Sequence, residues 1–271
     1  MLSLLKKLTA TTPAQPIAPV VEEVDTFQLG LRDAMLSGWF NHDTGELYKG
    51  FTVGPEDTLV DVGCGDGGNM QFCGMRGARI IVADIDAAKI EAARQRLSET
   101  SARSVEYHVT DGNPLPIADG TATRVVSTEV LEHVDDPAQF LAELVRIGQP
   151  GALYLLSVPH PSSEDVQKGI AMPEYFEKPN HIRIISEDQF KAMVSEAGLE
   201  IVSHSQYGFY RSLWMLLFWE AKVDLSSPDH PLLNQWTKTW EAVLNSPRGT
   251  QIKHALDSVM AKSQVIIARK P

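Results

Sequence analysis

The 271-residue chain is poor in the features that mark a secreted or membrane-spanning protein. It has only two cysteines, Cys64 and Cys73, which are too few for a disulfide framework and are not spaced as a zinc-binding C-x-x-C pair. So low a cysteine content favours a reducing compartment, and we expect a cytoplasmic location. No apolar run approaches the roughly 18 residues of a spanning helix, so no transmembrane segment is expected.

Positive charge is also scarce. The chain has 24 Lys and Arg against 35 Asp and Glu, which gives a net charge of −11. Binding to a nucleic-acid backbone requires basic surface, so we expect no nucleic-acid partner. The length is sufficient to bury a sizeable core. We expect the proline-containing residues 1–24 to form a flexible tail and linker, and residues 25–271 to form the folded part.

The chain is organised around a buried strand that ends in a glycine-rich turn. Leu59 to Val62 are mostly apolar and β-branched, as in a strand that is covered on both faces. Gly63 to Gly68 follow at once, and glycine lets the backbone approach a ligand closely. Residues 69–75 are suited to begin a helix. This order of elements predicts a nucleotide-type site at the carboxyl end of a strand in an open α/β sheet.

Two classes of cofactor fit this turn. Its glycines match the dinucleotide pattern G-x-G-x-x-G, and the acidic Asp84 lies about 20 residues further on. From Asp61 onward the same turn has the pattern D-x-G-x-G-x-G, which resembles motif I of the class I S-adenosylmethionine (SAM) methyltransferases. The carboxylates of Asp61 and Asp66 would repel a pyrophosphate and attract the ammonium and sulfonium groups of SAM. Charge therefore favours SAM, and an NAD(P)-dependent oxidoreductase is the alternative.

Later motifs extend the resemblance. Strands are expected at residues 79–84 and 105–109, and the second of these leads to Asp111-Gly112 and Leu115-Pro116. A further strand leads to Glu132-His133. This order is similar to that in the methyltransferase group (type 11-like) that includes the ubiquinone- and biotin-pathway enzymes. The resemblance implies that SAM is the cofactor and S-adenosylhomocysteine the product. The cofactor-binding residues it implies are Asp61, Gly63, Cys64, Gly65, Gly67, Asp84, Ile85, Asp111, Gly112 and Thr128.

The alternation of short strands with helices predicts an α/β fold, a Rossmann-like sheet wound on both faces. The family resemblance implies seven mostly parallel strands, with the last strand, at residues 263–269, antiparallel. Residues 207–262 separate this strand from the one before it, whereas typical connections have a median of roughly 4–6 residues. This aromatic-rich stretch is expected to form a helical cap over the active site.

SAM carries an electrophilic methyl group, so the protein must align an acceptor and, for a hydroxyl, remove a proton. The candidate bases are His133, His160 and His181, with Glu129 and Tyr207 behind them. We predict His133 and His160, which follow neighbouring strands, as the catalytic pair, and a structural role in a loop is the alternative for each. The spacing shows no metal-ligand pattern, so no metal site is predicted.

The prediction is methyl transfer to a hydroxyl of a small or medium-sized molecule, such as a sugar or polysaccharide precursor. The expected partner is a small-molecule or a glycan- or lipid-linked acceptor. C-methylation of a quinone-type ring, carboxyl methylation and non-catalytic SAM binding are the alternatives. A homodimer is a further expectation.

Overall fold

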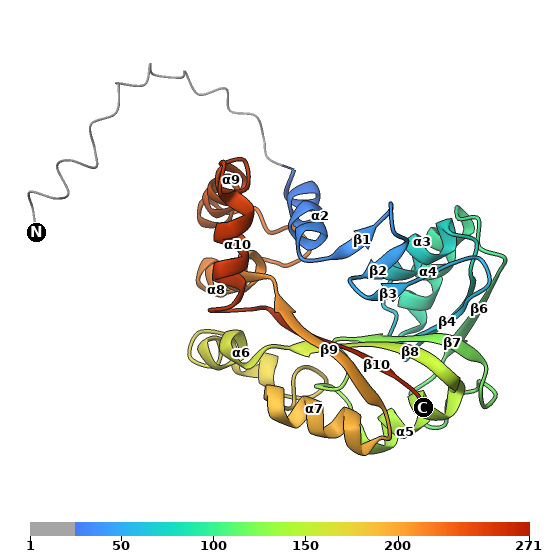
Figure 1. Ribbon diagram of the computed structural model, residues 1–271. Helices are drawn as coiled ribbons and strands as arrows, with labels where there is room; N and C mark the ends of the chain where they lie inside the picture. The colour runs from blue at the N-terminus through green and yellow to red at the C-terminus, as the bar shows by residue number, and fades with distance from the viewer. Residues whose placement is uncertain (1–24) are drawn as a thin grey trace, which may run out of the picture.

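The computed structural model describes residues 25–271, so the tail predicted for residues 1–24 lies outside the described residues. Seven strands form one sheet in the order β6-β5-β4-β7-β8-β10-β9 (Figure 1). Their bounds are β4 Thr58–Val62, β5 Arg79–Asp84, β6 Ser104–Val109, β7 Ala122–Thr128, β8 Gly148–Pro159, β9 Glu200–Tyr207 and β10 Ser263–Arg269. Strands β4 to β8 pair in parallel, and β10 runs antiparallel between β8 and β9. The predicted fold class is confirmed.

Helices cover both faces of this sheet because the strands are apolar on both sides. Every residue of the central strand β4 is buried. One face packs against α3 (Gly68–Met75) and α4 (Ala87–Ser98), and the other against α5 (Pro137–Ile147) and α7 (Glu187–Glu196). The strand order reverses between β4 and β7. A ligand site is therefore expected at the carboxyl ends of these two strands.

A small second sheet precedes the large one and was not predicted. After α2 (Thr26–Leu36), strands β1 (Trp39–Asn41), β2 (Glu46–Tyr48) and β3 (Phe51–Thr52) pair in an antiparallel arrangement. Strands of two or three residues are too short to show the alternation by which a strand is recognised in a sequence. Their aromatic residues Trp39, Tyr48 and Phe51 are buried against the face of the large sheet that also carries α3 and α4.

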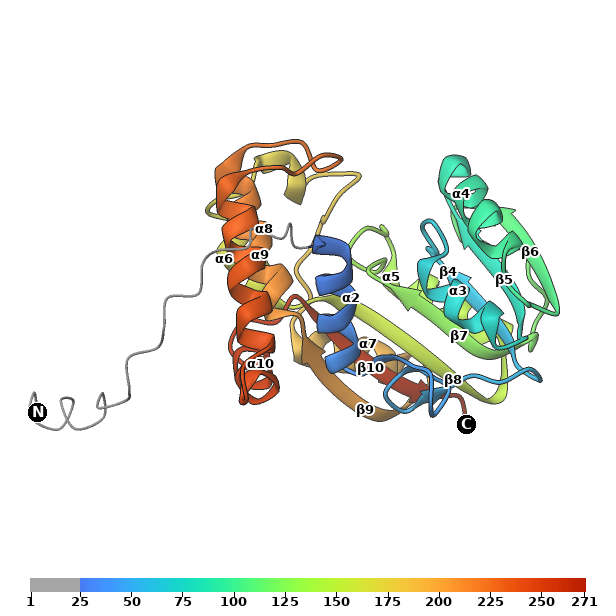
Figure 2. The ribbon, with the colours of Figure 1, turned by 90° about the horizontal axis from the view of Figure 1, so that it is seen from above.

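The stretch before the last strand is helical, as predicted. It contains α8 (Phe209–Ala221), α9 (Pro231–Leu244) and α10 (Gly249–Asp257). Leu29 of α2 packs into the same apolar cluster as Trp214 and Trp240, so α2 completes this group of helices (Figure 2). The strand register aligns Tyr207, where the stretch begins, with Ser263 and Pro159. The helices therefore leave the sheet at the edge where its parallel strands end.

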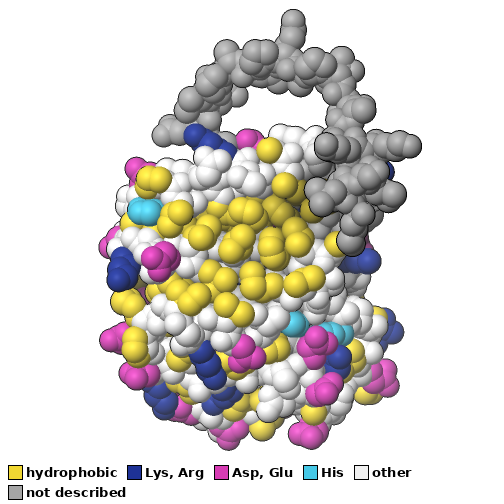
Figure 3. Space-filling view, turned by 90° about the vertical axis from the view of Figure 1, so that its left-hand side faces the viewer, with side chains coloured by type: hydrophobic (Ala, Val, Ile, Leu, Met, Phe, Trp, Pro, Cys, Tyr) yellow, Lys and Arg dark blue, Asp and Glu magenta, His cyan; other side chains and the backbone are white. Residues whose placement is uncertain are grey.

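Hydrophobic side chains gather on the outer face of this helical group. Figure 3 shows a broad hydrophobic patch on the side of the molecule where α8, α9, α10 and the short helix α6 (Pro161–Gln167) lie. Exposed apolar side chains on these helices include Val166, Leu232 and Ile252. Within residues 25–271, none of the helices combines the length and the apolar character that crossing a bilayer requires.

Candidate active site

The glycine turn has the conformation that its sequence predicts. Gly63, Gly65 and Gly67 have φ angles of +77°, +53° and +77°, a region that only glycine enters at little cost. A Cβ atom on Gly63 would lie 2.2 Å from Cγ2 of Val130. The turn therefore packs directly against the loop that follows β7, and a glycine is required at the point of contact.

Asp61 lies near the carboxyl end of β4, the strand that leads into this turn. Its side chain is 1% exposed, and among the described residues its Oδ1 atom has no hydrogen-bond partner. Burial, with a smaller contribution from the negative charge of Asp84, raises the pKa of Asp61 to about 8. A buried carboxylate oxygen without a partner is costly unless a donor or a cation meets it. Asp61 is therefore suited to receive the ammonium group of a ligand.

Asp84 ends the neighbouring strand β5 and braces the turn. Its Oδ2 accepts a hydrogen bond from the Gly65 N–H (2.9 Å), and its Oδ1 accepts one from the Asp86 N–H (2.9 Å). A carboxylate has about four lone-pair positions, so two remain for a ligand such as a ribose diol. Asp86 caps α4 by accepting from the Ala88 N–H, and Ile85 is 73% exposed beside it.

The remaining predicted cofactor residues lie at the same edge of the sheet. Asp111 is exposed after β6, while Gly112 is buried and faces the ring of Phe140. Thr128 ends β7, and its hydroxyl accepts a hydrogen bond from Asn69 of α3 (3.4 Å). Cys64 is buried, and burial raises the pKa of its thiol well above the usual range, so it is a neutral space-filling residue.

Asp66 differs from the expectation. Its carboxylate pairs with the guanidinium of Arg96 on α4 at 2.6 Å. The Arg96 Nε–H also donates to the Asp66 carbonyl at 3.0 Å. This partner neutralises much of the charge of Asp66, so Asp66 does not supply the repulsion of a pyrophosphate that the sequence suggested. The charge argument for SAM therefore rests on Asp84, and on Asp61 once a bound cation stabilises its ionised form.

A large cavity adjoins the turn. It has a volume of about 1030 Å³ and lies between α2, α3 and α8. Asn69 and Phe72 line it from α3, and Tyr210 and Trp214 line it from α8. Ligand pockets usually measure about 300–1,000 Å³. None of the predicted cofactor residues and neither predicted base lines this cavity. The cavity is therefore a space beside the turn that suits part of an acceptor, and the cofactor position is inferred from the turn itself.

His160, one of the two predicted bases, is engaged at both ring nitrogens. Its Nδ1 accepts from the Ser162 N–H (3.2 Å) and lies 2.7 Å from the Ser162 hydroxyl. Because Nδ1 accepts, Nε2 carries the proton and donates to the Glu187 carboxylate at 3.2 Å. His160 thus caps α6 and ties it to α7. Its role as a base stays a prediction.

His133, the other predicted base, has one free ring nitrogen. Its Nδ1 lies 3.1 Å and 2.9 Å from the carbonyl oxygens of Pro179 and Asn180. Carbonyls only accept, so Nδ1 carries the proton and Nε2 has the lone pair. Burial, and then repulsion from His181, lowers the pKa of His133 below its usual value. The ring is therefore neutral near pH 7 and suited to accept a proton or bind a cation.

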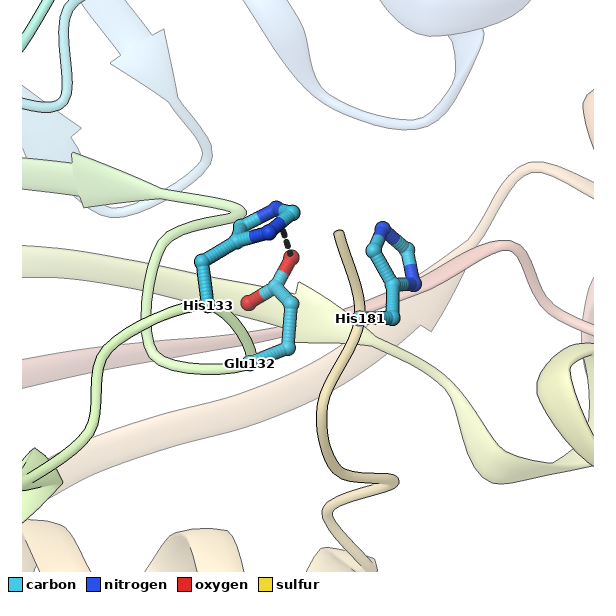
Figure 4. Close-up of side chains that lie close together, drawn as sticks. All are labelled: Glu132, His133 and His181. Carbon is cyan, nitrogen blue, oxygen red and sulfur yellow. Dashed lines mark ion pairs between the residues drawn. The ribbon is translucent and has the colours of Figure 1, made fainter. Parts of the chain in front are cut away.

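The fold brings His133 together with two other ligand-type side chains. Glu132, His133 and His181 each offer one atom within a set whose members all lie within 4.8 Å of one another (Figure 4). His181 follows the short 3-10 helix η1 (Pro173–Phe176), so it is distant from the other two in sequence. The spacing of residues in the sequence predicted no metal site. The structure nevertheless brings together one carboxylate and two imidazoles, which are side chains that bind metal ions.

The sequence did not point to Glu164 or Lys262. Glu164 of α6 is buried and accepts from His181 Nδ1–H at 2.7 Å. Lys262 forms an ion pair with Glu129, whose other oxygen accepts from Ser157 (2.9 Å). Neither residue belongs to a motif, and only the tertiary structure reveals these pairings.

Comparison with known proteins agrees with this geometry. Residues 60–156 match the family model described as a methyltransferase domain. The chain is also 27% identical over 145 residues to a probable S-adenosylmethionine-dependent methyltransferase of Mycolicibacterium smegmatis, covering 53% of this chain and 52% of that protein. Residues 60–156 are therefore similar to a SAM-dependent methyltransferase domain. This matched region includes the glycine turn and the Glu132-His133 loop.

Two further proteins, one known by sequence and one by structure, are also similar to this chain. A ubiquinone biosynthesis O-methyltransferase of Hahella chejuensis is 36% identical over 99 residues, which is 36% of this chain and 41% of that protein. The structure of geranyl diphosphate C-methyltransferase from Streptomyces coelicolor A3(2) superimposes with a TM-score of 0.58 and 17% identity, over 94% of this chain and 85% of that one. At this identity the likeness shows the fold. The chain spans about half the length of several curated relatives it matches.

Proposed function

We propose that the protein transfers the methyl group of SAM to a hydroxyl oxygen of a small or medium-sized acceptor. SAM, when bound, supplies an electrophilic methyl group on a sulfonium. The partnerless buried oxygen of Asp61 carries the proposal, because it calls for a cationic group within a turn shaped for close backbone approach. Asp84 at the rim of the turn is placed to bind the ribose hydroxyls, and Asp111 to bind the adenine amino group.

The acceptor side of the site supports oxygen as the methylated atom. A hydroxyl must lose its proton as it reacts, so a neutral side chain with a free lone pair is needed nearby. His133 has this form, with Nε2 unoccupied by any hydrogen bond within the described residues. The contact of Val130 with the glycine turn places the His133 loop next to the cofactor region.

The cavity indicates an acceptor of some size. Aromatic side chains of α8 and α3 line it, and such surfaces stack well on apolar rings and on the faces of sugars. We include a sugar or polysaccharide precursor, free or attached to a lipid, among the acceptors. A homodimer through the hydrophobic patch of Figure 3 and a cytoplasmic location complete the proposal.

The test is mass spectrometry of three acceptor classes incubated with SAM that carries a deuterated methyl group. The classes are sugar diols, quinol-type rings and fatty-acyl carboxylates. We expect a labelled product with the methyl group on a hydroxyl oxygen. Label on ring carbon or on a carboxylate would overturn the oxygen assignment. Binding of S-adenosylhomocysteine without any labelled product would indicate a non-catalytic SAM-binding protein.

Two histidine variants refine this test. We expect His133→Gln to lower kcat by about 10²-fold or more, as is typical for loss of a proton-accepting group. In His160→Gln the links to Ser162 and Glu187 weaken, and the thermal midpoint should fall. If His160→Gln abolishes turnover while its thermal midpoint is unchanged, His160 and not His133 is the base.

A further inference from the structure

We propose that Glu132, His133 and His181 bind a divalent transition-metal ion that holds the acceptor hydroxyl, an inference that deepens the proposed function. The three ligand atoms lie within 4.8 Å of one another. Metal–ligand bonds to His and Glu measure about 2.0–2.2 Å, so small side-chain rotations bring all three onto one ion. Figure 4 shows the Glu132 carboxylate directly below the His133 ring, with His181 beside them on a different segment.

Both histidines are held in the form that a metal ligand requires. His133 donates its Nδ1–H to the carbonyls of Pro179 and Asn180, at 3.1 and 2.9 Å. His181 directs its Nδ1 to the Glu164 carboxylate, at 2.7 Å. In both histidines Nε2 is therefore the nitrogen whose lone pair is left to bind a metal ion. Metal-binding histidines nearly always give their other N–H to a carboxylate or backbone carbonyl, which fixes the tautomer and the ring orientation.

Glu132 provides an independent indication of a ligand. It is 1% exposed, and neither of its carboxylate oxygens has a hydrogen-bond partner within the described part of the chain. Two buried oxygens without partners are costly, and a cation bound beside them removes that cost. Nε2 of His133 lies 3.8 Å from Glu132 Oε1, which is too long for a hydrogen bond.

The two loops that supply these ligands are fastened to each other. The Ile182 N–H donates to the Glu132 carbonyl at 3.0 Å, directly beside His181. Arg183 Nη1 donates to the Leu131 carbonyl at 2.7 Å. Ligands held on rigidly connected backbone lose little entropy when an ion binds. The site is therefore largely formed before any ion arrives.

The ligand types identify the class of ion. Imidazole nitrogens suit Zn²⁺, Fe²⁺, Co²⁺ and Ni²⁺, and the carboxylate also suits Mn²⁺, whereas Mg²⁺ and Ca²⁺ prefer sites made of oxygen ligands alone. Three protein ligands leave coordination positions open for other molecules. Glu129 is paired with Lys262, so Glu132 is the carboxylate that would supply negative charge to the ion.

The position of the site indicates its use. Val130, two residues before Glu132, contacts Gly63 of the glycine turn, so the ion would lie next to the bound methyl donor. A divalent cation lowers the pKa of a hydroxyl that it binds. The acceptor oxygen would form the new C–O bond as the C–S bond of SAM breaks, with the electron pair going to sulfur and the hydroxyl proton to water. With the ion bound, the Nε2 lone pair of His133 is used by the ion, so His133 would then act as a ligand and water would replace it as the proton acceptor. An acceptor with two adjacent hydroxyls would occupy two open positions and be oriented by both.

The test is titration of the full chain, stripped with EDTA, with Co²⁺ followed by absorption and with Mn²⁺ followed by calorimetry. We expect one ion per chain for the wild-type protein and at least a tenfold loss of affinity in Glu132→Gln and His181→Asn. Glu164→Gln, which leaves all three ligands in place, should weaken binding by about 10–100-fold. His254→Gln, at an exposed position on α10, is the matched control and should bind as the wild type does.

Calorimetry with S-adenosylhomocysteine separates this inference from the proposed function. Each variant should keep wild-type affinity for S-adenosylhomocysteine, which also shows that it is folded. Failure of the wild type to bind Co²⁺ or Mn²⁺, or equal binding by the Glu132 and His181 variants, overturns the site. Labelled product formed at an undiminished rate in EDTA overturns its role with the acceptor, whereas loss of turnover that Mn²⁺ restores supports it.

Discussion

Nζ of Lys253 lies 2.7 Å from Oδ2 of Asp257, and both side chains are buried in the helical group that covers the site. The other oxygen of Asp257 accepts from the N–H groups of Gly208 and Phe209, where α8 begins. Lys253 also lies 3.5 Å from Asp33 of α2. One buried lysine thus joins α2, α8 and α10, and two of these helices, α2 and α8, line the cavity.

Lys253→Met should therefore loosen the cap. It leaves Asp33 and Asp257 buried without their cation, and removal of one partner of a buried pair usually costs about 3–5 kcal/mol. Urea unfolding should show this loss in the free energy of unfolding. Lys89→Met, at an exposed position on α4, serves as the control and should change stability by less than about 0.5 kcal/mol. Equal stability of the two variants would show that the buried pair does not hold the helices.

Asp61→Asn should raise the stability of the folded chain and lower its affinity for SAM. The pKa of Asp61 is about 8 in the folded chain against 3.8 without the fold, so folding disfavours the ionised form. Below about pH 4 the carboxyl is protonated in both states, and its favourable contribution to the free energy of unfolding is fully present. This contribution is lost as the pH rises from about 4 toward 8, because the unfolded chain ionises first. Asparagine removes this dependence.

The variant should accordingly unfold at a higher temperature than the wild type near pH 8, by about 2–6 °C for a gain of about 1–3 kcal/mol. At pH 4 the two proteins should have the same midpoint. Affinity for SAM should fall about tenfold or more, since the partner of its ammonium group becomes neutral. A midpoint difference that stays constant with pH would contradict the burial of an ionisable Asp61.

Gly63→Ala should disrupt the turn by two effects. The residue has a φ of +77°, and an added Cβ would meet Val130 Cγ2 at 2.2 Å. Strain in this region costs about 1–2 kcal/mol, and overpacking typically adds about 1–3 kcal/mol. Gly151→Ala isolates the first effect, because Gly151 has a φ of +81° with no atom within 4 Å of an added Cβ. We expect the Gly63 variant to be the less stable by thermal unfolding and to lose SAM affinity. Equal losses of stability would indicate that contact with Val130 is unimportant.

The features that could be predicted from the sequence are those that depend on short-range patterns of residues. The strand before Gly63, the cap of α4 at Asp86 and the helices of residues 207–262 all leave periodic or positional signals, and the structure contains them. Contacts between distant segments leave no such signal. His181 meets Glu132 only because two loops are tied together by backbone hydrogen bonds, so the metal-type cluster was not predicted. The pairing of Asp66 with Arg96 similarly depends on how α4 packs.

Binding calorimetry with S-adenosylhomocysteine and NADH tests the central assignment most directly. The wild-type protein should bind one S-adenosylhomocysteine per chain and give no heat with NADH. Asp84→Asn should weaken the first interaction about tenfold, since a charge-assisted hydrogen bond contributes about 1.5–3 kcal/mol. Binding of NADH without binding of S-adenosylhomocysteine would contradict the account, because Asp61, Asp84 and the glycine turn would then serve a different cofactor.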